Sequence, residues 1–328
     1  MNPCNSTTID KSSSIAGPVV LDENSPLSAH VERIDITEFD GDESEETNGA
    51  GVPRSEAQMF VYVFKLSDEA PAEETADDDE NVTTCQQTIL PACSFDGLWD
   101  SLIFDTAVKR NVLDYAMTAM LFSDSKVNPH IISWNRVVLL HGPPGTGKTS
   151  LCKALAHKLS IRLSSRSVFV TVDEVESLTA ARKSAVSGSE PSDAIRVVNA
   201  LLTQLDSLKR YSNVLILTTS NITEAIDVAF VDRADIKQYV EASATASRKR
   251  AAGQMTSPPG SEDLELSTEL LQAAEMAEGF SGRALRKLPF QAHAFFVQSR
   301  TPSVSGFIHH LMQTIQRELE HRQQLISG

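Results

Sequence analysis

Hydrophobic residues in this chain form short runs and helical stripes, most of them in its second half. Apolar runs typical of parallel strands buried on both faces lie at 137–140, at 168–172 and within 213–221, and a last strand is predicted at 236–240. Apolar residues recur at helical spacing over 106–122, 150–159 and 195–205. Strands that alternate with helices in this way predict an α/β domain, with a parallel sheet flanked by helices.

The first part of the chain has weaker patterns. Residues 1–27 are rich in Ser, Thr, Asn and Pro, which predicts a disordered tail. A strand pattern follows at 29–39, and the β-branched and aromatic run 59–66 predicts a second strand. The acidic stretch 69–80 is predicted to be a solvated loop, with docking of a basic partner as the alternative. We therefore expect a short N-terminal β-containing domain over 28–95.

The chain after the last strand pattern is first loop-like and then helical. Residues 241–262 are rich in Ala, Ser and Pro and predict a linker. Helical spacing then continues to the C-terminus, with an expected break or kink at Pro289. The predicted parts are a tail (1–27), an N-terminal domain (28–95), a large α/β subdomain (96–240), a linker (241–262) and a helical lid (263–328).

Composition narrows the functional classes. The 328 residues are 41% hydrophobic, enough for about two or three domains with real cores. A net charge of −15 argues against a duplex-DNA binder, so we expect no direct nucleic-acid contact. The four cysteines are too scattered for a disulfide framework or a zinc site. Without an apolar leader or a long apolar run, we also expect no secretion and no membrane span.

The most informative stretch directly follows the run 137–140. Residues 142–149 read Gly-Pro-Pro-Gly-Thr-Gly-Lys-Thr and fit the phosphate-binding pattern G-x-x-x-x-G-K-[ST], between a predicted strand and a predicted helix. Backbone N–H groups and the positive helix N-terminus attract polyphosphate, and glycines leave room for it. The predicted nucleotide-binding residues are Gly142, Pro143, Pro144, Gly145, Thr146, Gly147, Lys148, Thr149 and Ser150. Lys148 is expected to reach the outer phosphates, and the Thr149 hydroxyl to bind Mg²⁺.

Polar residues end two further strand patterns. The run 168–172 ends in Asp173 and Glu174, the Walker B pattern. Asp173 is expected to hold Mg²⁺, and Glu174 to polarise the attacking water. Asn221 follows the run 213–217, and ligands bind where parallel strands end. It is therefore predicted to lie beside the γ-phosphate, with a turn-capping role as the alternative.

Together these motifs resemble an AAA+ ATPase, with ATP and Mg²⁺ as cofactors. The stretches 134–166 and 173–239, including Asp-Glu-Val-Glu-Ser-Leu-Thr-Ala-Ala-Arg from position 173, are similar to the pachytene checkpoint family, also called the thyroid-receptor-interacting AAA+ proteins. The resemblance is good over 95–240 and 278–328 and loose over 28–95.

The resemblance implies a homo-hexameric ring that remodels HORMA-domain proteins with an adaptor. It implies roles in the spindle checkpoint and on meiotic chromosome axes, in nucleus and cytoplasm. By motif, Asn221 resembles sensor 1 and Arg283 resembles sensor 2, although Arg283 could be only a lid-surface charge. Arg233 is a candidate arginine finger offset from the usual position, where Asp235 stands. The alternative for Arg233 is a buried salt bridge to Asp232 or Asp235.

One segment departs from the family pattern. Only residues 160–167 separate the first predicted helix from the Walker B strand, and no aromatic-bearing pore loop fits there. The sheet is therefore predicted to lack its usual edge strand, with the Walker B strand as the new edge. Two function classes stay open: an ATP-driven remodeller, and a partial nucleotide-binding subunit that cannot unfold a substrate. A GTPase is disfavoured because Asn221-Ile222-Thr223-Glu224 is not a guanine-reading N-K-x-D motif.

Overall fold

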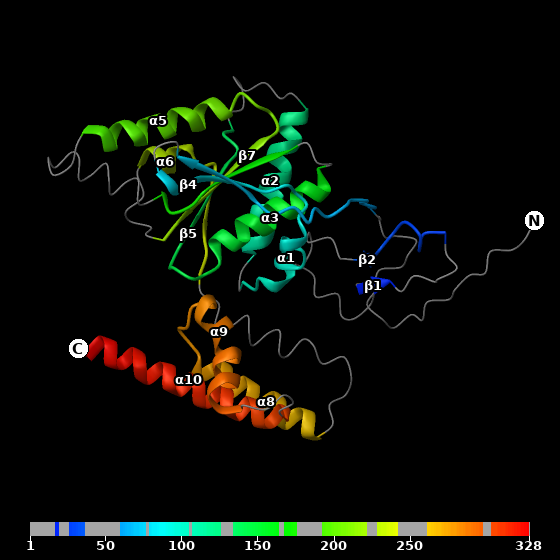
Figure 1. The fold of residues 1–328 in the computed structure, drawn as a ribbon, viewed down its shortest axis with the longest axis vertical. Coiled ribbons are helices and arrows are strands. Elements are labelled where there is room, and N and C mark those ends of the chain that lie inside the picture. Colours follow the sequence, from blue (N-terminus) through cyan, green and yellow to red (C-terminus); the bar gives the residue numbers. More distant parts are fainter. Residues whose placement is uncertain are drawn as a thin grey trace, which may run out of the picture. The chain divides into compact units, whose positions relative to one another are not determined.

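The computed structural model has two compact units, residues 1–62 and 63–328. It describes residues 17–19, 26–36, 60–76, 79–104, 107–125, 134–163, 167–175, 192–221, 228–241, 261–297 and 303–327 (Figure 1). None of the helices in these ranges combines the length and apolar composition that crossing a membrane requires.

The N-terminal unit contains a small antiparallel ladder. Strand β1 (Gly17–Val19) pairs with β2 (Ile34–Ile36), and Val19 lies opposite Ile34. Strand β2 confirms part of the strand pattern at 29–39. Strand β1 lies in the predicted disordered tail, and for its three residues that prediction is wrong. A β-branched pair across a ladder is favourable whatever the composition around it. The rest of the predicted tail up to residue 16 lies outside the described residues.

The strand predicted at 59–66 is also wrong for its described residues, 60–66, which form no ladder. Val61 and Val63 are 82% and 90% exposed, so the run lacks the neighbours that make a β-prone sequence a strand. The antiparallel hairpin β3 (Ala72–Ala76) and β4 (Asp79–Gln87) forms instead, mostly within the predicted acidic loop. Its ladder uses backbone groups, which do not depend on hydrophobic side chains.

A four-stranded parallel sheet is the centre of the second unit. Its strands are β5 (Val137–His141), β6 (Val168–Val172), β7 (Val214–Ser220) and β8 (Ile236–Tyr239). Their order is β6-β7-β5-β8, and every pair is parallel. All four strands were predicted, three from apolar runs and β8 from the mixed pattern at 236–240. The carboxyl ends of β5, β6 and β7 therefore meet at one edge, where the sequence places its polar motifs.

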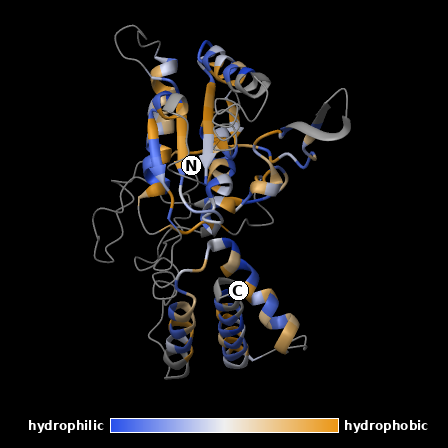
Figure 2. Ribbon diagram, turned by 90° about the vertical axis from the view of Figure 1, so that its left-hand side faces the viewer, coloured by the Kyte–Doolittle hydropathy of each residue, from blue (hydrophilic) through white to orange (hydrophobic). Residues whose placement is uncertain are grey.

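Helices cover both faces of this sheet (Figure 1). Side chains of α2 (Val108–Asp124) and α3 (Lys148–Arg162) pack with Val138 and Leu140 on one face. Side chains of α5 (Ser192–Leu208) and α6 (Val228–Arg233) pack with Val137 and Leu139 on the other. This alternation along β5 follows from the two-residue period of a strand. Figure 2 shows the sheet strands as mainly hydrophobic, whereas the helices carry both kinds of residue.

Strand β6 is an edge of the sheet, as predicted. It pairs with β7 on one side, and no strand among the described residues pairs with its other side. Helix α3 ends at Arg162 and β6 begins at Val168, so only residues 163–167 connect them. The described residues between α3 and β6 form no further strand.

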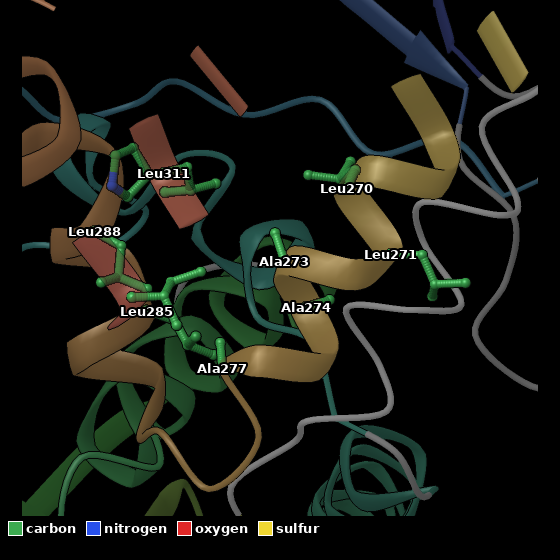
Figure 3. A pocket seen from close by; sticks show the side chains of 10 residues that line it. Leu270, Leu271, Ala273, Ala274, Ala277, Leu285, Leu288 and Leu311 are labelled. Atoms are coloured by element: carbon green, nitrogen blue, oxygen red, sulfur yellow. The ribbon is translucent and has the colours of Figure 1, made fainter. Parts of the chain in front are cut away.

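The C-terminal part is helical. It consists of α8 (Ser261–Met276), α9 (Gly282–Ala292), the π-helical turn η3 (His293–Val297) and α10 (Val304–Ser327). Pro289 lies inside α9 rather than ending it; the helix continues to Ala292 and then changes to η3. The predicted break is therefore displaced by a few residues. The three helices line an apolar pocket of about 190 Å³ that is partly open to solvent, where leucines of α9 and α10 face alanines of α8 (Figure 3).

Candidate nucleotide-binding site

The phosphate-binding loop connects β5 to α3, as its motif requires. Gly142 and Gly145 have φ angles of 139° and 79°, which side chains rarely adopt. A Cβ on Gly142 would lie 2.4 Å from the carbonyl oxygen of Val240, and one on Gly145 would lie 2.9 Å from Ser281 Oγ. Both positions therefore need glycine. Pro143 and Pro144 are exposed on the loop between them, whereas Thr146 is buried.

Lys148 begins α3 with its side chain turned back over the loop. It is only 4% exposed, and its Nζ donates to the carbonyl oxygens of Gly142 and Pro143 at 2.8 and 2.7 Å. The Thr146 hydroxyl donates to the same Pro143 oxygen at 3.1 Å. The loop thereby holds an ammonium group at its own opening. A fixed cation in that place strongly favours a phosphate oxygen as its further acceptor.

Asp173 brings together two other parts of the fold. Its Oδ1 accepts a hydrogen bond from Thr149 Oγ1 of α3 at 3.2 Å and one from Thr219 Oγ1 of β7 at 2.8 Å. The predicted pair Thr149 and Asp173 is therefore adjacent in space. Thr219 was not predicted as a site residue. The polar run that follows the apolar half of β7 was the available signal for it.

Glu174 is held in an unusual backbone conformation. Its φ is 56°, in the left-handed region that glutamate rarely occupies. Its N–H donates to Thr219 Oγ1 at 3.2 Å, and its Oε1 accepts from Asn221 Nδ2 at 3.3 Å. Strain of this kind persists where surrounding contacts hold it, often at functional sites. Thr219 and Asn221, both at the end of β7, thus orient the predicted catalytic carboxylate.

These groups fit ATP with Mg²⁺. The loop joins a strand to a helix N-terminus, where Gly142 and Gly145 have positive φ angles, and the buried Lys148 supplies the cation. Thr149 and Asp173 offer one hydroxyl and one carboxylate, the few oxygen ligands that Mg²⁺ takes from a protein when it also binds phosphates. Mg²⁺ would neutralise charge on the β- and γ-phosphates. Ser150 follows on α3, half-buried beside this set.

Two titratable side chains beside the loop are kept neutral. Burial, and next the Lys148 ammonium, lower the pKa of His141 at the end of β5. Burial, and next the charge of Asp173, raise the pKa of the Cys152 thiol on α3. Neither residue therefore adds charge near the phosphates at neutral pH. The charges that matter for nucleotide binding come from Lys148 and the two carboxylates.

Arg233 and Asp235, at the end of α6, have structural partners. Arg233 pairs with Asp206 of α5 rather than with Asp232 or Asp235. Asp235 accepts from the Tyr115 hydroxyl at 2.6 Å and from the backbone N–H of Asn135 at 2.7 Å. Arg233 thus forms a salt bridge, as the alternative prediction stated, but its partner is Asp206. Its role as an arginine finger stays a prediction.

The lid meets the phosphate-binding loop at the start of α9. The Arg283 N–H donates to the Gly145 carbonyl oxygen at 3.2 Å, and Ser281 Oγ caps the helix by accepting from the Ala284 N–H at 3.3 Å. The Arg283 side chain is exposed. The backbone therefore places Arg283 next to the loop, while its predicted sensor role rests on its motif.

Helix α1 (Leu98–Ser101) lies against α3, the helix that follows the phosphate-binding loop. Trp99 is buried, and the ammonium groups of Lys109 and Lys158 lie 5.3 and 4.5 Å from its ring centroid. This environment supports a core role for Trp99 rather than stacking on adenine. Leu102 and Phe104, which follow α1, lie closer to the phosphate-binding loop than Trp99 does. Their side chains are the nearest atoms to a Cβ built on Gly147.

The sheet order, the loop–helix phosphate site and the helical lid define an AAA+ ATPase. Two family models match the chain. The model for the ATPase family associated with various cellular activities matches residues 138–170 and 162–242, and the TRIP13-like AAA+ ATPase lid C-terminal domain matches residues 215–319. The match to the first of these models is divided into two parts, and the division lies where α3 is followed by β6.

The chain belongs to the pachytene checkpoint protein 2 (TRIP13) family. It is 45% identical to the human pachytene checkpoint protein 2 homolog over 338 positions, which cover 83% of this chain and 78% of the human protein. The solved structure of C. elegans PCH-2 is similar with a TM-score of 0.66, at 30% identity over 79% of each chain. The HORMA:CdnC:Trip13 complex of E. coli MS115-1 matches with a TM-score of 0.54 over 70% of this chain and 93% of that one, and its 13% identity shows the fold alone.

The human alignment also contains gaps in this chain. It runs over 338 positions, more than the 328 residues of the whole chain, although it uses only part of them. It therefore contains gaps where the relative has residues that this chain lacks.

Proposed function

We propose that the protein works with an adaptor in the ATP-dependent remodelling of HORMA-domain proteins. The proposal rests on family membership and on the solved bacterial complex that contains a HORMA protein together with a Trip13 protein. From the family resemblance we further propose that the protein forms a homo-hexameric ring. We also propose that it acts in the spindle checkpoint and in meiotic chromosome-axis control, in the nucleus and cytoplasm and on meiotic chromosomes.

One feature of the sequence favours the second form of this function, a nucleotide-binding subunit that does not grip the substrate itself. Residues 163–167, which connect α3 to β6, read Leu-Ser-Ser-Arg-Ser and contain no aromatic residue. Pulling on a polypeptide needs side chains that grip it and change position with the nucleotide state. The nucleotide contacts at Lys148, Asp173 and Asn221 lie on other segments. The geometry thus favours a subunit that binds and hydrolyses ATP but cannot by itself unfold a HORMA-domain substrate.

The test compares this chain with a variant that carries a family-length insert between Arg166 and Ser167. Each is mixed with ATP and a HORMA-domain substrate bearing a conformational reporter, and ATP turnover is measured in the same samples. We expect both to hydrolyse ATP and only the longer one to convert the substrate. Glu174→Gln in the longer variant is the control for ATP-driven conversion. Equal conversion by both chains would contradict the gripping argument, and absence of turnover from both would contradict the ATPase site.

A further inference from the structure

The outer side of strand β6 carries unpaired backbone groups. In the parallel ladder with β7, Val168, Val170 and Val172 direct their N–H and C=O groups towards β7; the Val168 N–H, for example, donates to the Asn213 oxygen at 2.9 Å. Phe169 and Thr171 therefore direct theirs outwards. No described residue bonds to these outward groups. Val168 is 49% exposed, whereas every residue of β7 is buried.

The two edges of the sheet differ in protection. Natural sheets protect exposed edges with charges, prolines or covering elements. The β8 edge carries Lys237, and Asn111 of α2 donates to Gln238 beside it at 3.4 Å. Strand β6 reads Val-Phe-Val-Thr-Val, without a charge or a proline. Within the described ranges, the β6 edge is thus open to a further strand.

The sequence of β6 matches itself in the antiparallel direction. In a two-fold arrangement centred on Val170, the two copies of Val170 lie opposite each other. Val168 then faces Val172, and Phe169 faces Thr171. All of these pairs are uncharged, and all contain β-branched residues, which stabilise cross-strand contacts. The backbone agrees with this register, because Phe169 and Thr171 are the outward-bonding residues and would exchange both hydrogen bonds.

We propose that β6 pairs with β6 of a second copy of this chain, joining two four-stranded sheets into one. Because the strands run in opposite directions, the two nucleotide sites lie at opposite edges of the joined sheet. Each phosphate-binding loop then stays open to its ligand. The pairing needs neither nucleotide nor a HORMA-domain protein, so it is independent of the proposed function.

The first experiment measures the mass of the full-length chain by sedimentation over a concentration series without nucleotide. We expect a monomer–dimer equilibrium that tightens as salt increases, because each copy has a net charge of −15 and salt screens the repulsion. Thr171→Pro removes an outward N–H and leaves the ladder with β7 intact. It should raise the dissociation constant about thirtyfold, since each copy loses one hydrogen bond and two bonds are worth about 2 kcal/mol. The matched control, Thr171→Val, keeps the N–H and should leave the dimer in place.

The second experiment tests the register without relying on Thr171→Pro. Opposite residues at a non-hydrogen-bonded position are close enough for a disulfide. In a background with Cys4, Cys85 and Cys93 replaced by Ser, which leaves only the buried Cys152, V170C should form an intermolecular disulfide under mild oxidation, seen on a non-reducing gel. V168C and the parent without either substitution should not. A chain that is monomeric at every concentration overturns the proposal. So does an assembly that Thr171→Pro leaves unchanged and V170C does not crosslink.

Discussion

Arg233 and Asp206 form a two-point ion pair that joins α6 to α5. Arg233 Nε lies 3.1 Å from Asp206 Oδ1, and Arg233 Nη2 lies 2.7 Å from Asp206 Oδ2. The Arg233 hydrogen bonds lower the pKa of the Asp206 carboxyl to about 2, and Lys209 contributes to the shift. These two hydrogen bonds hold the Arg233 guanidinium against a carboxylate of its own chain.

The first prediction concerns the stability contributed by this pair. Because the folded-state pKa of Asp206 is below its unfolded value, the stabilisation is present above about pH 4 and is lost as pH falls towards about 2. Asp206→Asn should lower the free energy of unfolding by about 0.2–1 kcal/mol at neutral pH, since the pair is partly exposed. Chemical denaturation across this pH range should show the difference from wild type shrinking in acid.

The same pair allows a test of the arginine-finger hypothesis. If Arg233 acts only through Asp206, Arg233→Ala and Asp206→Asn should have the same ATP turnover per folded chain. An arginine finger contributes about 10³–10⁵ in turnover. A loss of that size in Arg233→Ala alone would show that Arg233 leaves Asp206 and acts on nucleotide.

Lys148 is predicted to be essential for nucleotide binding. Lys148→Ala removes the buried ammonium at the loop opening and should abolish ATP binding in titration calorimetry. Lys153→Ala is the matched control, because Lys153 lies on the same helix with an exposed side chain. Equal ATP affinity for wild type and Lys148→Ala would refute the assignment of the loop.

Glu174 is predicted to act in hydrolysis rather than in binding. Glu174→Gln preserves the shape of the side chain and its contact with Asn221 but cannot accept a proton. We expect ATP affinity to be kept and turnover to fall by about 10²–10⁴. Single-turnover measurements with bound ATP separate these two effects. Wild-type turnover in the variant would assign the role of base to another group.

Local signals explain which parts of the fold were predictable. The strand–loop–helix around Gly142–Gly147 was predicted because its motif, its apolar strand and its helix are contiguous in the sequence. The β7 strand was predicted because it is buried on both faces and its first four residues, Val214–Leu217, are correspondingly apolar. The run 59–66 has the same composition without a neighbouring strand, and β3 and β4 form a ladder from residues that look like loop. Strand pairing, which single-sequence patterns do not contain, decides these cases.

In the candidate site, too, residues with a local sequence signal were predicted and residues that depend on long-range contacts were not. Asp173, Glu174 and Asn221 were identified because each ends a strand pattern. The contacts of Thr219 with Asp173 and Glu174 span 46 and 45 residues, and that of Asp206 with Arg233 spans 27. Such partners depend on the order of strands and helices in space. The acidic residues of this chain are numerous, and no local pattern separates Asp206 from the others.

The last prediction concerns Thr219, whose hydroxyl donates to Asp173 and accepts from the Glu174 N–H. Thr219→Val keeps the size of the side chain but removes both bonds, so Asp173 loses its orientation and the strained backbone of Glu174 loses its support. We expect ATP binding without Mg²⁺ to be unchanged, the Mg²⁺ concentration for half-maximal turnover to rise about tenfold, and maximal turnover to fall. Thr218→Val is the matched control: Thr218 is equally buried, and its hydroxyl donates to Val138 in the sheet, so it should cost stability without altering the Mg²⁺ dependence. If both variants shift the Mg²⁺ dependence alike, the effect comes from the sheet and not from the hydrogen bonds of Thr219 to the two carboxylate residues.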